Sequence, residues 1–326
     1  MRIALTYNEK RSAAEAEAEF DTRATIDALS DRLARLGHAV TPVDVGGSIG
    51  GLIERVKRIA PELIFDLAEG ERGAFREAFY PALFEQLGFA YTGSSPSTRA
   101  LCLDKWLAER IVAAEGIAVP GGTVVRRAAE LSRLPLEPPW IVKPNFEGSS
   151  KGITAASVVD DPARLAAVAR ACLDRYPEGV LVERYIAGLD VAVGWVDGLG
   201  WLPPIAYRHG APVFDYALKH VTPECVRVEI PAMLDDDVGA RLLRTAQRVF
   251  AALGVSGYGR ADFRITPRGD VVFLELNPLP SLADGELFAA ATAIGASPEE
   301  LLACIVRAAR VPIREPCRAA IQARAG

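Results

Sequence analysis

The stretch from residue 140 to residue 152, Trp-Ile-Val-Lys-Pro-Asn-Phe-Glu-Gly-Ser-Ser-Lys-Gly, carries the most informative pattern in the chain. A hydrophobic run that predicts a strand leads into Lys143, and a loop rich in glycine and serine follows. Glycines let backbone N–H groups approach an anion, hydroxyls add donors, and lysine supplies positive charge. The pattern indicates a phosphate-binding loop, although a hairpin with a lysine at its edge explains it equally well.

A second polar pattern lies on two predicted strands closer to the C-terminus. Asp262 lies in the first strand, and Glu275 and Asn277 lie in the second, where leucines alternate with them. Because Glu275 and Asn277 are two residues apart, their side chains project from the same face of the strand. Carboxylate and amide oxygens suit Mg²⁺ that also holds phosphates. A metal site is therefore favoured over a solvated polar face.

The composition excludes several classes of protein. The 326 residues carry a formal net charge of −5 with no long basic run, so we expect no nucleic-acid partner. The apolar stretches are too short for a membrane helix, and Met1 leads directly into a predicted strand rather than a signal sequence. The five cysteines are scattered and never form a C-x-x-C pair, which favours free thiols in a cytoplasmic protein.

Strands and helices alternate over the first hundred residues, which predicts an α/β domain with a parallel sheet over residues 1–96. The predicted strands of this domain are 2–7, 38–43 and 63–65, and its helices are 22–36, 49–59 and 75–87. A central domain is expected over 97–187, with helices at 97–116 and 162–176 and strands at 123–126, 140–143 and 180–183.

The third part of the chain, residues 188–312, is richer in strands and predicts an antiparallel α+β domain. Its predicted strands are 191–196, 201–206, 226–230, 257–265 and 271–276, and it contains a long helix at 235–253. The remaining residues, 313–326, form an arginine- and alanine-rich tail without a clear core face. Motifs of P-loop enzymes, dinucleotide-binding folds, H-E-x-x-H metalloproteases and G-x-S-x-G hydrolases do not occur.

The chain resembles the ATP-grasp superfamily and, within it, the D-alanine–D-alanine ligase-like family. The resemblance covers about residues 63–306 and rests on eight short motifs in the family's order. These motifs are Glu69-Gly70 with 76–78, 91–94, 103–105, 143–152, 182–185, 214–219, 259–262 and 275–278. The resemblance implies a three-domain ATP-grasp fold, with an N-terminal parallel-sheet domain and with ATP held between the second and third domains.

The resemblance also implies which residues bind MgATP. The residues that it places on the phosphates are Lys105, Lys143, the loop residues Glu147, Gly148, Ser149, Ser150 and Lys151, and Lys219 of a second loop. Glu183 and the backbone of Arg184, Tyr185 and Ile186 would contact adenine, and Asp190 would contact the ribose. Asp262, Glu275 and Asn277 would hold two Mg²⁺ ions, with Mn²⁺ as an alternative, in agreement with the strand pattern.

The implied chemistry has two steps. A carboxylate attacks the γ-phosphate of ATP to give an acyl phosphate and ADP, and an amine then displaces phosphate to form an amide. Arg260 would steady the acyl phosphate together with Lys219, although a salt bridge with Asp262 is the alternative for Arg260. The backbone N–H near Ser281 is a candidate oxyanion donor.

The substrate region departs from the family pattern. The family reads Asn-Thr-x-Pro-Gly and then a Ser-Leu pair that anchors the second substrate's carboxylate, whereas residues 277–287 read Asn-Pro-Leu-Pro-Ser-Leu-Ala-Asp-Gly-Glu-Leu. Asp284 or Glu286 lies near the place of that serine and would repel a carboxylate, although Asp284 also suits a helix cap.

Two further positions differ from the family. The family's N-terminal Gly-Gly-x-Ser-x-Glu loop is absent, so Glu19 or Asp21 is a candidate for the first substrate's ammonium group, unless this segment is only a solvated helix start. His220 stands where the family has a tyrosine, as a substrate contact or as a surface histidine.

We therefore expect an ATP-dependent carboxylate–amine ligase that joins amino acids or amino-acid-like substrates in a biosynthetic pathway and releases ADP and phosphate. The departures favour a reaction outside cell-wall dipeptide formation, and the alternative is a conventional D-alanine–D-alanine ligase. A non-ligating ATP-binding protein and a kinase-like ATP-grasp enzyme are weaker alternatives. The family also implies a homodimer.

Overall fold

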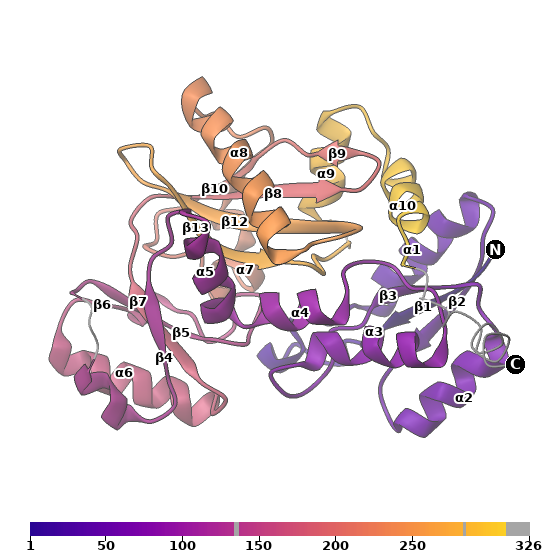
Figure 1. Cartoon of the computed structure of the whole chain (residues 1–326), viewed down its shortest axis with the longest axis horizontal. Coiled ribbons are helices and arrows are strands. Elements are labelled where there is room, and N and C mark those ends of the chain that lie inside the picture. The colour runs from indigo at the N-terminus through magenta and orange to yellow at the C-terminus, as the bar shows by residue number, and fades with distance from the viewer. Residues whose placement is uncertain (134–136, 283–284, 311–326) are drawn as a thin grey trace, which may run out of the picture.

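A computed structural model describes residues 1–133, 137–282 and 285–310, which form three sheets covered by helices (Figure 1). In Figure 1, β1–β3 lie to the right, β4–β7 lie at the lower left, and the C-terminal sheet lies between them in the upper half. The domain boundaries predicted above, after residues 96, 187 and 312, stay predictions. The pairing of strands into sheets does not show at which residue one domain ends and the next begins.

The N-terminal sheet is parallel, as predicted, with the strand order β2-β1-β3. Its strands are β1 (Arg2–Tyr7), β2 (Ala39–Asp44) and β3 (Leu63–Leu67), and its helices are α1 (Arg23–Arg35), α2 (Ile49–Ile59) and α3 (Arg76–Leu87). Ile3 and Leu5 pack toward α1, whereas Ala4 between them packs toward α2 and α3. The two-residue period of a strand thus explains why β1 is buried from Ile3 to Tyr7, since both faces are covered.

The central sheet is antiparallel, with the strand order β4-β7-β5-β6. Its strands are β4 (Gly122–Val125), β5 (Trp140–Pro144), β6 (Val158–Val159) and β7 (Val180–Arg184). Helix α6 (Pro162–Arg175) covers one face and buries Leu165 and Ala169 against Trp140 and Val142. The side chain of Asp161 caps this helix by accepting a hydrogen bond from the backbone N–H of Ala163 at 2.8 Å.

The C-terminal sheet has the order β11-β10-β8-β12-β13, with β9 paired to β8, and all its pairs are antiparallel. Its strands are β8 (Leu189–Val196), β9 (Gly200–Trp201), β10 (Ile205–Arg208), β11 (Arg227–Glu229), β12 (Tyr258–Ile265) and β13 (Val271–Asn277). Val191 and Val193 pack toward α8 (Asp236–Leu253), whereas Ala192 packs toward α9 (Glu286–Ala293) and α10 (Pro298–Arg307).

Two of the predicted elements are wrong in detail. The single helix over 97–116 is two helices, α4 (Pro96–Leu103) and α5 (Lys105–Ala114), because Asp104 leaves helical geometry and its side chain caps α5. The single strand over 201–206 is interrupted between β9 and β10, where Pro203 and Pro204 supply no backbone N–H to a sheet ladder. The sequence analysis missed α10 and the short elements α7 (Tyr216–His220), η1 (Glu15–Glu17), η2 (Ala128–Arg133), η3 (Ala155–Ser157) and η4 (Pro223–Cys225).

A buried ion pair joins the N-terminal sheet to the helix that leaves it. Asp66 of β3 and Arg99 of α4 are both fully buried, and their charged atoms lie 2.9 Å apart. Thr6 donates a further hydrogen bond to Asp66 at 2.8 Å.

Within the described parts of the chain, no single helix is long and apolar enough to cross a membrane. Only α9 and α10 taken together pass the length and composition test, and they meet at a 106° bend.

Candidate active site

A cavity of about 570 Å³ lies where the three sheets meet. Most of the residues predicted to bind nucleotide, metal or substrate line it. Those lining residues are Glu19, Asp21, Lys105, Lys143, Gly148, Ser149, Ser150, Glu183, Arg184, Tyr185, Ile186, Asp190, Lys219, His220, Arg260, Asp262, Glu275, Asn277, Ser281 and Glu286. Glu147 and Lys151 are not among the lining residues, and Asp284 lies outside the described residues.

The pairing of β12 with β13 brings the predicted metal ligands together. Asp262 is directly opposite Glu275, and Arg260 is directly opposite Asn277. Lys105 Nζ lies 3.0 Å from Glu275 Oε2. Burial alone would raise the pKa of Glu275, but Lys105 and Lys143 lower it to about 2, so this carboxylate is ionised at neutral pH. Oxygen donors on facing positions of two strands fit a divalent cation.

Arg260 and Asp262 form a bidentate pair. The Arg260 Nε and Nη2 groups donate to the two carboxylate oxygens of Asp262 at 2.8 and 2.7 Å, and Nη1 donates to Glu286 at 3.2 Å. The salt bridge between Arg260 and Asp262, which the sequence analysis gave as the alternative role of Arg260, is therefore present. It is not a surface salt bridge, because only 14% of the arginine side chain is exposed. A cation bound by Asp262 would compete with this pair and release the guanidinium group.

Two lysines occupy the other side of the cavity. Lys143 Nζ lies 2.7 Å from Glu183, and both side chains are buried. Glu109 lies behind this pair; burial and the adjacent Glu183 raise its pKa to about 10, so Glu109 is a neutral acid. Lys105 also donates to the backbone carbonyl of Glu147, so one lysine connects the glycine-rich loop to the metal-binding strands. The sequence analysis did not identify Glu109, because its role depends on burial.

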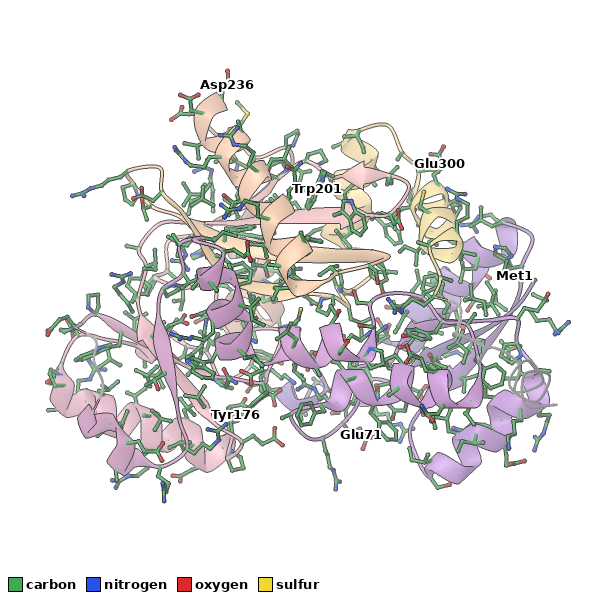
Figure 2. The ribbon with its side chains drawn as sticks, in the orientation of Figure 1. Met1, Glu71, Tyr176, Trp201, Asp236 and Glu300 are labelled. Atoms are coloured by element: carbon green, nitrogen blue, oxygen red, sulfur yellow. The ribbon has the colours of Figure 1, made fainter. Side chains whose placement is uncertain are left out.

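The glycine-rich loop has the tight backbone geometry of an anion-binding turn. Ser149 and Ser150 have φ angles of 50° and 56°, in the left-handed region, and Gly152 has a φ of 73°. A Cβ atom at Gly152 would lie 2.6 Å from Tyr176, which is at the end of α6 (Figure 2). Only glycine fits this position.

The segment expected to be a second loop contains the short helix α7 (Tyr216–His220), and it contacts the glycine-rich loop. Ser150 donates a hydrogen bond to the Phe214 carbonyl at 2.9 Å, and His220 Nε2 lies 3.3 Å from the Ser149 carbonyl. Lys219 lines the cavity beside them, and burial together with the positive charge of Arg260 lowers its pKa. An anion between Lys219 and Arg260 would relieve this charge repulsion.

Asp190 is already paired in this structure. Its carboxylate lies 2.7 Å from Arg264 and 3.0 Å from His209 Nε2. A ribose contact therefore requires Asp190 to accept a hydroxyl in addition to these partners. The role stays a prediction.

The N-terminal segment contributes carboxylates, but not in the way that was expected. Glu19 lies 2.9 Å from Arg76 and also pairs with Lys151, and these cations lower its pKa although burial opposes them. Asp21 has no such ion pair with a described residue, and burial raises its pKa to about 7. Two lining residues from the Glu-Gly…Arg-Glu motif, Glu69 and Glu77, were not predicted as site residues, although the motif itself was noticed.

Comparison with known proteins shows the same relationship along most of the chain. The family described as "D-ala D-ala ligase C-terminus" matches residues 118–307. The D-alanine–D-alanine ligase of Syntrophotalea carbinolica is 35% identical over 295 residues, which are 90% of this chain and 92% of that protein. The D-alanine–D-alanine ligase of Citrifermentans bemidjiense is 34% identical and covers 86% of this chain and 88% of its own length.

Solved structures agree on the fold. The D-alanine–D-alanine ligase from Bacillus anthracis superimposes with a TM-score of 0.76 at 24% identity and full coverage of both chains. The VanG D-Ala:D-Ser ligase from Enterococcus faecalis gives a TM-score of 0.74 at 21% identity, covering 94% of this chain and 98% of that one. The predicted ATP-grasp fold is confirmed. From its sequence and its fold, the chain belongs to the D-alanine–D-alanine ligase family of ATP-dependent carbon–nitrogen ligases.

Proposed function

We propose that the protein joins D-alanine to a second D-alanine through an acyl phosphate, at the expense of ATP. Curated relatives that match about nine-tenths of its length carry this name. They favour the conventional ligase, given above as the alternative, over a ligase for unrelated substrates. The observation that carries the proposal is the arrangement of Asp262, Glu275 and Asn277 beside Lys105 and Lys143 in one cavity.

The residues divide the work between the nucleotide and the amino acids. Lys105, Lys143 and the loop at 147–152 would bind the phosphates, because they supply positive charge and backbone donors. Asp262, Glu275 and Asn277 would hold Mg²⁺, or Mn²⁺ in its place, which neutralises phosphate charge when bound. Two observations support this assignment: the carboxylates of Asp262 and Glu275 lie on facing positions of two strands, and the pKa of Glu275 is lowered to about 2.

The amino-acid steps would take place next to Arg260 and Lys219. The carboxylate of one substrate attacks the γ-phosphate, and the bond from that phosphorus to the bridging oxygen of ADP breaks. The amine of the second substrate then attacks the acyl carbon, and inorganic phosphate leaves with the carboxylate oxygen. Arg260 and Lys219 would offset the negative charge of both intermediates, and the backbone N–H near Ser281 would donate to the oxyanion.

The experiment measures ADP release with MgATP and D-alanine, followed by mass spectrometry of the product, with L-alanine as the control substrate. Lys143→Ala should abolish turnover in a folded protein, because the phosphates lose a buried cation. Lys57→Ala, on the exposed part of α2, should leave turnover unchanged. The absence of a dipeptide from D-alanine, or normal turnover by Lys143→Ala, would contradict the proposal.

We also propose that the enzyme acts as a cytoplasmic homodimer. Phe75 and Phe79 of the α3 region are 69% and 46% exposed and offer an apolar surface for a second copy. Four free cysteines among the described residues fit a reducing compartment. Size-exclusion chromatography with light scattering tests the dimer, and Phe79→Lys should yield monomers.

A further inference from the structure

Strand β12 carries a third charged side chain on its cavity face, which the proposed function does not use. Arg260, Asp262 and Arg264 are two residues apart along the strand, so they project from one face, and all three line the cavity. Arg260 and Asp262 belong to the proposed reacting groups. Arg264 continues the row and lies directly opposite Asp190 of β8, the residue predicted to contact ribose.

Arg264 contacts three separate parts of the cavity wall. Its side chain is only 7% exposed, and Nη2 lies 2.7 Å from Oδ1 of Asp190. Nη1 donates to the backbone carbonyls of Ile186 and Pro212, each at 3.2 Å. The guanidinium carbon lies 5.9 Å from the ring centre of Tyr185. One side chain therefore connects the predicted ribose-binding acid to the backbone predicted to contact adenine.

The two carbonyls belong to connecting segments outside the helices and strands. Ile186 lies between β7 and β8, and Pro212 lies between β10 and α7. The Tyr185 hydroxyl also donates to the Pro212 carbonyl at 2.7 Å. Backbone without a sheet ladder or a helix keeps one conformation only where other contacts fix it. Arg264 and Tyr185 provide such contacts for both segments.

Asp190 is held at both of its carboxylate oxygens. Oδ1 faces Arg264, and Oδ2 lies 3.0 Å from Nε2 of His209, whose ring stacks on Phe214 with the centroids 5.7 Å apart. A carboxylate has about four lone-pair positions, so it can accept from hydroxyl groups in addition to these two partners. The partners fix the plane of the carboxylate and thus the directions from which a hydroxyl can donate.

The fold does not need the Arg264–Asp190 pair to join its strands. β8 and β12 already pair over eight consecutive positions, from Tyr258 with Val196 to Ile265 with Leu189. A buried ion pair adds little stability by itself, because both charges lose their hydration. The contacts of Arg264 are better explained by what they hold in place, which is one acid and two carbonyls beside the cavity.

We infer that Arg264 is a positioning residue for the nucleoside part of ATP, which orients Asp190 toward the ribose and fixes the connection between β7 and β8 beside the adenine. This inference rests on the proposed function and assigns a residue to its nucleotide site. Lysine could not replace the arginine, because a single nitrogen cannot place donors at the spacing of Nη1 and Nη2.

The test measures equilibrium binding by calorimetry, with MgATP and without amino acids. Arg264→Met should weaken MgATP binding about tenfold or more, and Arg264→Lys about fivefold or more, because both lose charge-assisted hydrogen bonds. The wild type should bind 2′-deoxy-ATP or 3′-deoxy-ATP about fivefold or more weaker than ATP, and Arg264→Met should bring this ratio close to one. Magnesium tripolyphosphate, which lacks the nucleoside, should bind the wild type and both variants equally.

Arg268→Met is the matched control, since Arg268 is exposed in the turn that joins β12 to β13. It should bind every probe like the wild type, and circular dichroism confirms that the variants fold. Arg264→Lys keeps the charge opposite Asp190 and carries the test if Arg264→Met does not fold. Wild-type MgATP binding by the folded Arg264 variants, or an equal loss of tripolyphosphate binding, would overturn the inference. So would a wild type that binds ATP and both deoxy analogues equally.

The outcomes separate this inference from the proposed function. The binding assay contains no amino acid, so weaker nucleoside binding by the Arg264 variants supports the inference even where D-alanine gives no dipeptide. Dipeptide formation by Arg264→Met with the wild-type KM for ATP leaves the ligase function in place and rejects the role of Arg264. A raised KM for ATP with an unchanged kcat is the result expected in turnover.

Discussion

Replacing Glu77 by glutamine should make the folded protein less sensitive to alkaline pH. Glu77 is buried, accepts no hydrogen bond from a described residue, and has a pKa raised from 4.5 to about 7, chiefly by burial. A carboxyl group whose pKa is raised in the folded state adds stability below its unfolded pKa. That stability is lost as the pH rises through the folded value, because the ionised form is favoured in the unfolded chain.

The size of the effect follows from the two pKa values. A shift from 4.5 to about 7 corresponds to a cost of about 2.5 kcal/mol in the free energy of unfolding between pH 5 and pH 8. Glutamine resembles the protonated acid in shape and carries no charge, so the variant should lack this cost. The stability difference between variant and wild type should therefore grow in favour of the variant across this interval.

The assay is urea unfolding followed by tryptophan fluorescence at four pH values from 5 to 8, without MgATP or amino acids. Titrating groups that do not interact with Glu77 affect wild type and variant alike and cancel in the difference, whereas Glu69, whose pKa Glu77 raises, adds to the difference in the same direction. Glu71→Gln, which alters an exposed residue of the neighbouring loop, should show the wild-type dependence. Parallel pH profiles for wild type and Glu77→Gln would refute the reasoning.

Three other substitutions test separate parts of the structure. Glu275→Gln should raise the Mg²⁺ concentration for half-maximal activity about tenfold or more, and an unchanged Mg²⁺ titration would count against the metal site. Gly152→Ala should destabilise the protein by about 2–3 kcal/mol, because a positive φ and a close tyrosine ring both oppose a Cβ atom. In the same urea unfolding assay Gly37→Ala should cost only about 1 kcal/mol, because Gly37 has a positive φ but open space around it. Asp66→Asn should cost about 3–5 kcal/mol, since it leaves the buried Arg99 charge unpaired, and a loss below 1 kcal/mol would reject this view of the ion pair.

Local patterns were sufficient to predict the parallel N-terminal sheet and the antiparallel pairing of the C-terminal sheet, but not the central sheet, whose strand β6 (Val158–Val159) was missed. The alternation of apolar runs with helical periodicity gave β1–β3, and the spacing of Glu275 and Asn277 placed both on one face of β13. The break at Asp104 was missed because the apolar spacing continues across it, and only the cap geometry shows that one helix ends and another begins. The interrupted strand before β10 carried a visible signal, since two adjacent prolines cannot sustain a ladder.

The site was less predictable where it depends on contacts between distant segments. Glu19 was predicted as a substrate ligand, but Arg76 and Lys151 come to it from other parts of the chain and engage it. Glu77 was noticed only as part of a motif, because the burial that raises its pKa is a tertiary property. Charge, spacing and residue type identify candidate ligands; which of them remain available is decided by packing.

The central claim is that a carboxylate of the substrate becomes phosphorylated before the amide forms. The most direct measurement uses D-alanine labelled with oxygen-18 in its carboxyl group, together with MgATP, and analyses the released phosphate by mass spectrometry. Transfer of one labelled oxygen to phosphate, in step with dipeptide and ADP, is the predicted result. Unlabelled phosphate accompanying the dipeptide would contradict an acyl phosphate, and ADP without any dipeptide would contradict a ligase.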